Sequence, residues 1–167
     1  MVLEDGSGPG LRAANGQHWR YVADTVMGGV STGALTRGLC HGTQALHLTG
    51  AVSLANNGGF VQMALDLAPQ GQVLDATRFA GLSLLLHGND AHYNIHLRSP
   101  DMVRVWQSWR VQVQIPARWV QIFVPFSDFT PHRTELPVQP ARLSRIGLVA
   151  IGREMRVDLA LARLELV

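Results

Sequence analysis

The side chains best suited to chemistry in this sequence are amides, arginines and histidines that alternate with apolar residues. Such alternation is typical of half-buried strands, in which successive side chains point to opposite faces. Amides and guanidinium groups offer planar, bidentate donors and acceptors, which suit a sugar, a carboxylate or another polar surface. An ordinary solvated sheet face is the alternative, although Lys and Glu, common on such faces, are missing here. The expected polar face carries Gln62, Asn94, His96, Arg98, Arg110, Gln112, Gln114 and Gln121.

Two of the four tryptophans are candidates for a stacking platform beside this face. Trp106 stands near an expected turn, and Trp119 begins an expected strand on its polar side. Either ring could stack on a sugar ring or on a partner side chain, and packing in the core or at its rim is the alternative. Trp19 and Trp109 are expected in the core.

Zinc and thiol chemistry have weak support. His92 and His96 would share one strand face about 13 Å apart, given a rise of roughly 3.3 Å per residue. Two ligands so far apart cannot hold one ion. Cys40 and His41 are neighbours in sequence, so a strand would point them to opposite faces and prevent a catalytic dyad. We therefore expect no metal centre and no catalytic residue from these groups.

Two carboxylates stand beside glycine-rich segments. Asp24 opens the stretch DTVMGGVS, and Asp66 ends the strand that follows the stretch SLANNGGF. Both are expected as turn caps, and ligation of a structural calcium ion is the alternative. An enzyme that uses Asp24 or a histidine in a loop pocket is a further hypothesis. The sequence has no P-loop, nucleophile elbow or dinucleotide fingerprint, so no cofactor is expected.

Composition narrows the function classes. The chain has 167 residues, 47% of them hydrophobic, and a formal net charge of +2, which fits one globular domain and gives no reason to expect nucleic-acid binding. All 14 basic residues are Arg, which excludes a Lys nucleophile or Schiff base. Cys40 is the only cysteine, so no internal disulfide forms. The chain lacks a signal peptide and a membrane-spanning apolar run, which predicts a cytoplasmic location without membrane insertion.

Short alternating runs separated by turn signals predict an all-β protein. No segment has sustained helical periodicity, so a β-sandwich or jelly roll is the expected fold class. Residues 1–17 are Gly-rich and polar, which suggests a flexible leader before a single domain over 18–167. A slip in the alternation near 161–164 predicts a bulge. Strands are expected within 60–67, 79–90, 92–99, 108–116, 118–129, 145–152 and 155–167.

Four stretches resemble the complex I intermediate-associated protein family. They are WRYVADTVMGGVSTG, LTGAVSLANNGGFVQM, FAGLSLLLHGNDAHYNIHLR and WVQIFVPFSDFTP, and the resemblance covers residues 19–166. It implies a jelly roll of the galactose-binding type, similar to carbohydrate-binding modules. It also implies a scaffold or chaperone that assists assembly of the membrane arm of respiratory complex I and has no established catalysis. The lack of a transit peptide and of Lys indicates a bacterial member, for which the assembly role is an open question.

The double glycines of the two motifs invite a structural explanation. Glycine inside a strand usually marks a bend or a close approach of two backbones. We expect segments 24–31 and 53–60 to lie side by side, with polar side chains hydrogen-bonding the bends. The alternative is that both loops line a ligand pocket. The motif residues concerned are Asp24, Met27, Gly28, Gly29, Ser31, Asn56, Asn57, Gly58 and Gly59.

Three functions follow from these observations. The first is a non-catalytic module that binds a protein partner, such as membrane-complex subunits, through an exposed apolar or aromatic patch. The second is a module that binds a glycan or another small polar ligand in a groove of a concave sheet face, lined by amides, Arg98 and Arg110. The third is a small enzyme with a loop pocket.

Overall fold

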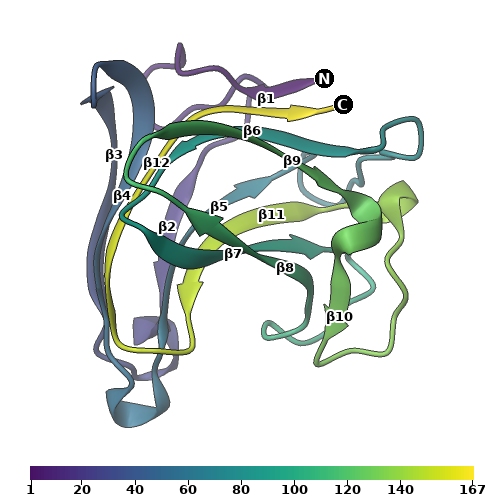
Figure 1. Cartoon of the computed structure of the whole chain (residues 1–167). Coiled ribbons are helices and arrows are strands. Elements are labelled where there is room, and N and C mark those ends of the chain that lie inside the picture. Colours follow the sequence, from purple (N-terminus) through teal and green to yellow (C-terminus); the bar gives the residue numbers. More distant parts are fainter.

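The computed structural model describes all 167 residues and consists of two antiparallel sheets that enclose one core (Figure 1). This confirms the expected all-β sandwich. The first sheet has the order β3-β4-β12-β6-β9, and β1 also pairs with β12. Its strands are β1 (Val2–Glu4), β3 (Thr32–Cys40), β4 (Thr43–Val52), β6 (Gly81–His87), β9 (Trp119–Pro125) and β12 (Met155–Leu166).

The second sheet has the order β10-β8-β7-β11-β5-β2. Its strands are β2 (Arg20–Ala23), β5 (Phe60–Asp66), β7 (Ala91–Arg98), β8 (Ser108–Ile115), β10 (Thr130–His132) and β11 (Arg145–Ile151). Helix is limited to four single turns of 3-10 type, none of which has the length to cross a bilayer. These turns are η1 (Asp24–Met27), η2 (Ala55–Asn57), η3 (Phe126–Asp128) and η4 (Pro140–Arg142).

The core lies between the sheets, and most strands turn alternate side chains toward it. One cluster of 33 buried residues extends from Leu3 to Leu166, and the indole rings of Trp19 and Trp109 lie inside it. The pairing of β12 with β6 shifts between Leu161 and Arg163, where the sequence analysis placed a bulge. The shift lets β12 turn apolar side chains to the core along its whole length.

Residues 1–17 pack onto the sandwich, contrary to the expectation of a flexible leader. β1 pairs with the end of β12, and the Met1 ammonium donates to the Leu166 carbonyl at 2.7 Å, so the two termini lie side by side (Figure 1). The expectation rested on the polar, Gly-rich composition of this segment. Composition does not reveal that one of its polar residues has a buried partner.

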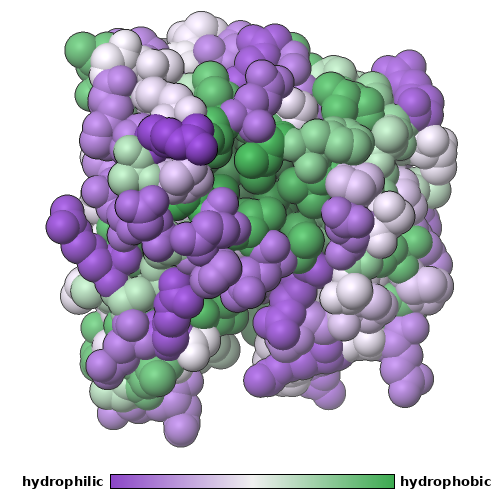
Figure 2. All heavy atoms as spheres, viewed as in Figure 1, coloured by the Kyte–Doolittle hydropathy of each residue, from purple (hydrophilic) through white to green (hydrophobic).

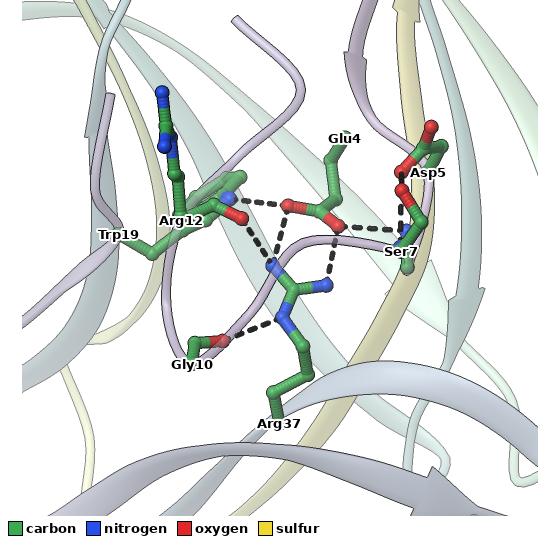
Figure 3. Close-up of polar contacts among 8 residues, drawn as sticks. Glu4, Asp5, Ser7, Gly10, Arg12, Trp19 and Arg37 are labelled. Carbon is green, nitrogen blue, oxygen red and sulfur yellow. Dashed lines mark hydrogen bonds and ion pairs between the residues drawn. The ribbon is translucent and has the colours of Figure 1, made fainter. Parts of the chain in front are cut away.

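That residue is Glu4, which is fully buried and faces the guanidinium of Arg37 from β3 (Figure 3). The Arg37 guanidinium donates to both carboxylate oxygens, at 2.6 and 3.0 Å. The indole of Trp19 donates to Oε2 at 2.8 Å, and the Gly6 amide donates to Oε1 at 2.8 Å. Arg37 also donates to the carbonyl of Gly10 at 2.6 Å, so the first turn of the chain is tied to the sheet.

Arg37→Ala is expected to lower the free energy of unfolding by about 3–5 kcal/mol, because it leaves the Glu4 carboxylate buried without its cation. Urea unfolding monitored by tryptophan fluorescence measures the change. Arg118→Ala, which removes an exposed arginine without an ion pair, is the control and should stay within about 0.5 kcal/mol of wild type. Equal stability of the two variants would show that Glu4 does not hold the N-terminal segment.

Candidate functional site

The outer side of the second sheet forms a polar face, as the alternation predicted. In the register of β7 and β8, Asn94 lies opposite Gln112, and His96 lies opposite Arg110. On the other side of β7, Val149 of β11 separates Asn94 from Gln62 of β5. The polar face therefore crosses several strands. Of the predicted residues it includes Gln62, Asn94, His96, Arg98, Arg110, Gln112 and Gln114.

Two predicted residues lie elsewhere. Gln121 and Trp119 belong to β9, which pairs with β6 at the edge of the first sheet. Gln121 donates to the Ser83 hydroxyl at 3.0 Å, and the Trp119 indole donates to the carbonyl of His41 at 3.1 Å. The alternation correctly placed Gln121 on the outer side of its strand. It could not show that the strand joins the opposite sheet, so placing both residues on the polar face was wrong.

Arg98 holds the β7–β8 loop in place, and most of its donors are engaged by that loop. Its guanidinium donates to the carbonyls of Val105 at 2.7 Å, Arg104 at 3.1 Å and Met102 at 3.3 Å. Trp106 stands in the same loop with half its surface exposed, and the Arg104 guanidinium lies 5.8 Å from its ring centroid. Trp106 is thus at the rim of the polar face, and its ring already has a cation beside it.

A hollow of about 560 Å³ opens on the polar face. Asn94, Gln112 and Arg110 line it from β7 and β8, while the β11–β12 turn and the segment around β10 form its sides. Figure 2 shows the lower side of the molecule indented between two projecting, mainly hydrophilic lobes; Figure 1 places the β11–β12 turn in one lobe and β10 in the other. The alternation did not select the lining residues Asp128 and Arg153, because Asp128 lies in η3, at the end of an expected strand, and Arg153 lies in the β11–β12 turn.

Polar groups in and beside this hollow lack partners within the protein. Asn94 is only 6% exposed, yet its carboxamide makes no hydrogen bond to another residue. The buried Nε2 of His96 and the buried hydroxyl of Ser108 are likewise unpaired. Buried polar atoms in native proteins are nearly always satisfied, so the unpaired atoms of His96 and Ser108 require an explanation, whereas the Asn94 carboxamide is open to the hollow.

The arginines of the polar face create a positive potential, which lowers the pKa of the neighbouring histidines. Burial, together with the charges of Arg110, His132 and Arg98, lowers the pKa of His96 to about 4. Burial and the neighbouring Arg110 also lower the pKa of His132. The His96 imidazole is therefore neutral at neutral pH and can both donate and accept a hydrogen bond.

A second hollow, of about 540 Å³, lies at the other end of the polar face. Asp66, one of the two predicted cap or calcium residues, lines it together with Arg20 and Arg145. The Asp66 carboxylate accepts from Arg145 at 2.8 Å and pairs with Arg20 at 3.2 Å. Asp66 is therefore the ion-pair partner of two arginines. Both arginines lie on the outer side of their strands, a position that the alternation of polar and apolar residues indicates.

Asp24 joins the two glycine motifs from a fully buried position. Its Oδ1 accepts from the Ser31 amide at 3.0 Å, and its Oδ2 accepts from the Ser31 hydroxyl at 2.5 Å. Oδ2 also accepts from the amides of Gly59 at 2.6 Å and Phe60 at 3.2 Å. The Ser53 amide in turn donates to the Ser31 hydroxyl at 2.9 Å. Segments 24–31 and 53–60 are therefore adjacent, as expected, and the Asp24 carboxylate bridges them rather than capping η1.

In each double glycine, one residue adopts a positive φ and the other leaves room for the Asp24 carboxylate. Gly28 and Gly59 have φ values of +84° and +144°, which favour glycine. A Cβ atom on Gly58 would lie 2.6 Å from Asp24 Oδ2, and one on Gly29 would overlap the same carboxylate. Asn56 and Asn57 differ from the expectation, because they contribute left-handed backbone with φ of 58° and 57° and no side-chain hydrogen bond to the bends. Asn tolerates this conformation better than most residues, which explains its presence.

Comparison with known proteins identifies the family. The sequence model for complex I intermediate-associated protein 30 matches residues 12–161. The chain belongs to this family. No curated protein sequence matches the chain.

Solved structures similar to this family member include carbohydrate-binding modules. One is the family 11 carbohydrate-binding module from Clostridium thermocellum in complex with a β-1,3-1,4-mixed-linked tetrasaccharide, with a TM-score of 0.73, 14% identity, and coverage of 99% of this chain and 94% of the module. Another is the family 30 module of a cellulosomal cellulase of the same organism, with a TM-score of 0.55, 12% identity, and coverage of 82% and 93%. At such identities the likeness shows the fold alone.

The family's glycine motifs also expose apolar side chains at one end of the sandwich. Val26 is 72% exposed, and Met27, Val30 and Leu54 are each about half exposed. No charged residue occurs within 25–36 or 48–65, so this apolar tip is also uncharged. The Asp24 hydrogen bonds fix the two loops that carry it.

Two further groups take structural positions. Cys40 is buried, and burial raises the pKa of its thiol. His41 stacks on His87 with ring centroids 3.7 Å apart, so it is not paired with Cys40. The structure brings no three His, Cys, Asp or Glu side chains together in a metal-holding arrangement.

Asp24→Asn is expected to lower the free energy of unfolding at neutral pH by at least about 2 kcal/mol, because a carboxamide cannot accept from all four donors. Burial raises the pKa of the Asp24 carboxyl, but the Ser31, Gly59 and Phe60 donors lower it more, so the pKa lies below 3.8. Its contribution is therefore complete above that pH and is lost as the pH falls through the lower folded value.

Urea unfolding at pH 7 and in steps toward about pH 2 measures both effects. The acid-induced loss of stability should be smaller in Asp24→Asn than in wild type. Asp128→Asn removes an exposed carboxylate without an ion pair and is the control. A stability and a pH profile equal to those of the control would contradict the role assigned to Asp24.

Proposed function

We propose that this chain is a non-catalytic binding module and that the polar face binds an oligosaccharide. The observation that carries the proposal is Asn94, a residue with 6% of its surface exposed, which lines the hollow and whose carboxamide has no hydrogen-bond partner in the protein. Family membership and the shared fold of carbohydrate-binding modules support a binding role. The volume of the hollow, about 560 Å³, is within the range of small-molecule sites.

The chemistry of the hollow suits hydroxyl groups. A sugar hydroxyl both donates and accepts, and adjacent hydroxyls can pair with a planar carboxamide or guanidinium at two points. Asn94, Gln112 and Arg110 supply such planar groups from neighbouring strands, and the Asp128 carboxylate adds an acceptor. Since all of these groups are side chains of the protein, the proposed binding needs no cofactor.

Arg110→Ala is expected to weaken binding of the best oligosaccharide from a neutral and acidic glycan panel by about 10- to 100-fold, because it removes charge-assisted hydrogen bonds. Gln112→Ala should weaken it less. Isothermal titration calorimetry measures the affinities, with and without EDTA, and chelation should leave them unchanged.

The controls for this experiment are Arg118→Ala and Gln121→Ala, which remove an exposed arginine and an exposed glutamine away from the polar face. Both should bind like wild type. Absence of binding to every glycan, or equal effects of Arg110→Ala and Arg118→Ala, would contradict the proposal. A loss of binding with EDTA would bring back a calcium ion as a participant.

A second candidate function is docking of a protein partner, and the apolar tip favours it. Four exposed apolar side chains on two fixed, uncharged loops are unusual for a surface without a partner. The family description names an association with intermediates of complex I, so subunits of that respiratory complex are the partners to test.

The double variant Val26→Ser/Met27→Ser is expected to abolish capture of respiratory complex I subunits from detergent-solubilised membranes of the host. Both substitutions remove exposed apolar surface and leave the Asp24 hydrogen bonds in place. Quantitative mass spectrometry of the captured proteins measures the change. Arg98→Ala/Arg110→Ala should retain the subunits. Their loss in that variant alone would move the partner to the polar face, and their absence with wild type would reject the docking function.

A further inference from the structure

We propose that the ligand of the polar face is an acidic oligosaccharide whose carboxylate binds between Arg110 and Arg153. This inference rests on the proposed function, because it specifies the class of glycan that the same hollow accepts. It is supported by the distribution of charge, by the arginines that remain free, by the lack of an aromatic floor and by the presence of Asp128.

The polar face is more positive than the protein as a whole. The two hollows are lined by five arginines and two aspartates, whereas the formal net charge of the chain is +2. The rest of the surface is therefore close to neutral on balance, because Glu4 and Asp24 are buried. Positive charge concentrated in a hollow attracts anionic ligands and raises their local concentration. The arginines are Arg20, Arg98, Arg110, Arg145 and Arg153.

Only some of these arginines are engaged within the protein. Arg20 and Arg145 share the Asp66 carboxylate, and the guanidinium of Arg98 donates to three loop carbonyls. The Arg110 side chain makes no hydrogen bond or ion pair, and Arg153 makes one contact of 3.5 Å with the carbonyl of His92. Neither guanidinium has an ion pair, and both line the first hollow, so a carboxylate there would meet two cations that have no anionic partner.

The floor of the hollow offers no aromatic platform for a neutral sugar. Trp106 lies in the β7–β8 loop with its own cation, and Trp119 lies on the first sheet. Stacking on an aromatic ring is the usual source of affinity for an uncharged sugar ring. Without it, recognition depends on hydrogen bonds and on charge, which favours a ligand that carries both hydroxyls and an anionic group.

Asp128 explains why the ligand is a sugar acid rather than an acidic peptide. It lines the same hollow, is exposed, and forms no ion pair. A ligand with many carboxylates and few hydroxyls would be repelled by Asp128 and would leave the carboxamides of Asn94 and Gln112 without partners. A uronate places one carboxylate per ring beside several hydroxyls, which matches two guanidiniums, two carboxamides and one acceptor.

The test is calorimetric titration of the whole chain with trimers of galacturonate, glucuronate and mannuronate, each compared with its methyl ester, which has the same hydroxyls and no charge. At least one acid is expected to bind at least tenfold more tightly than its ester. Arg110→Ala should reduce this ratio to near one, and Arg118→Ala should leave it unchanged. Binding of the acid should also weaken as salt is raised.

NMR titration of His96 gives an independent readout. A bound carboxylate is expected to raise the pKa of His96 from its value of about 4, because it supplies a negative charge beside the buried imidazole, whereas the bound ester should not.

The outcomes separate this inference from the proposed function. If esters bind as tightly as the acids, the oligosaccharide site stands and the inference is overturned. If no glycan binds, both fail. If hexaglutamate binds in an Arg110-dependent manner and no glycan does, the face is a site for an acidic protein segment, and both the sugar acid and the oligosaccharide site are rejected.

Discussion

One buried carboxylate determines how the two sheets meet. Asp24 directly follows β2, its partner Ser31 directly precedes β3, the Ser53 bonded to Ser31 directly follows β4, and Phe60 begins β5. A single hydrogen-bonded group therefore joins the ends of four strands, two from each sheet. An ionised carboxylate in the interior is stable only when donors replace its water, and here backbone amides and one hydroxyl do so. The glycine motifs follow from this requirement, because the amides reach the carboxylate only where no side chain intervenes.

A second buried carboxylate, Glu4, joins another set of segments that are far apart in the sequence. It brings the N-terminal segment, the indole that precedes β2, and β3 together around the Arg37 guanidinium. These two networks use nearly all of the hydrogen-bonding capacity of their members. The unpaired polar groups occur instead on the outer side of the second sheet, which is where the protein has donors and acceptors to offer a ligand.

The arginines also fall into two groups: some stabilise the fold, and others remain available to a ligand. Arg98 and Arg145 stand opposite each other, on neighbouring strands, yet both are held by groups of the protein itself. Arg110 stands one strand away with no such partner. The fold is shared with carbohydrate-binding modules, but the fold alone does not specify a ligand. In this chain the hollow combines two arginines, two carboxamides and one carboxylate, and no aromatic residue lines it.

Much of this arrangement is encoded locally. The alternation in 92–98 and 108–115 determines which side chains share a face, because the side-chain period of a strand is two and does not depend on its neighbours. The double glycines likewise indicate a close approach of backbone. Residues in connections, such as Asp128 and Arg153, follow no period, so only the folded chain reveals that they line the hollow.

The sequence by itself therefore determined strands β5 to β9, β11 and β12, their inner and outer sides, and the association of Asp24 with glycine, but it did not single out β1 to β4 or β10. Tertiary structure decided which sheet each strand joins, and thus removed Gln121 and Trp119 from the polar face. It also decided that Glu4 has a buried cation, and that Arg98 is engaged whereas Arg110 is free. The physical reason is that sheet membership and ion pairing depend on backbone and side-chain partners far apart in the chain, which a local period cannot specify.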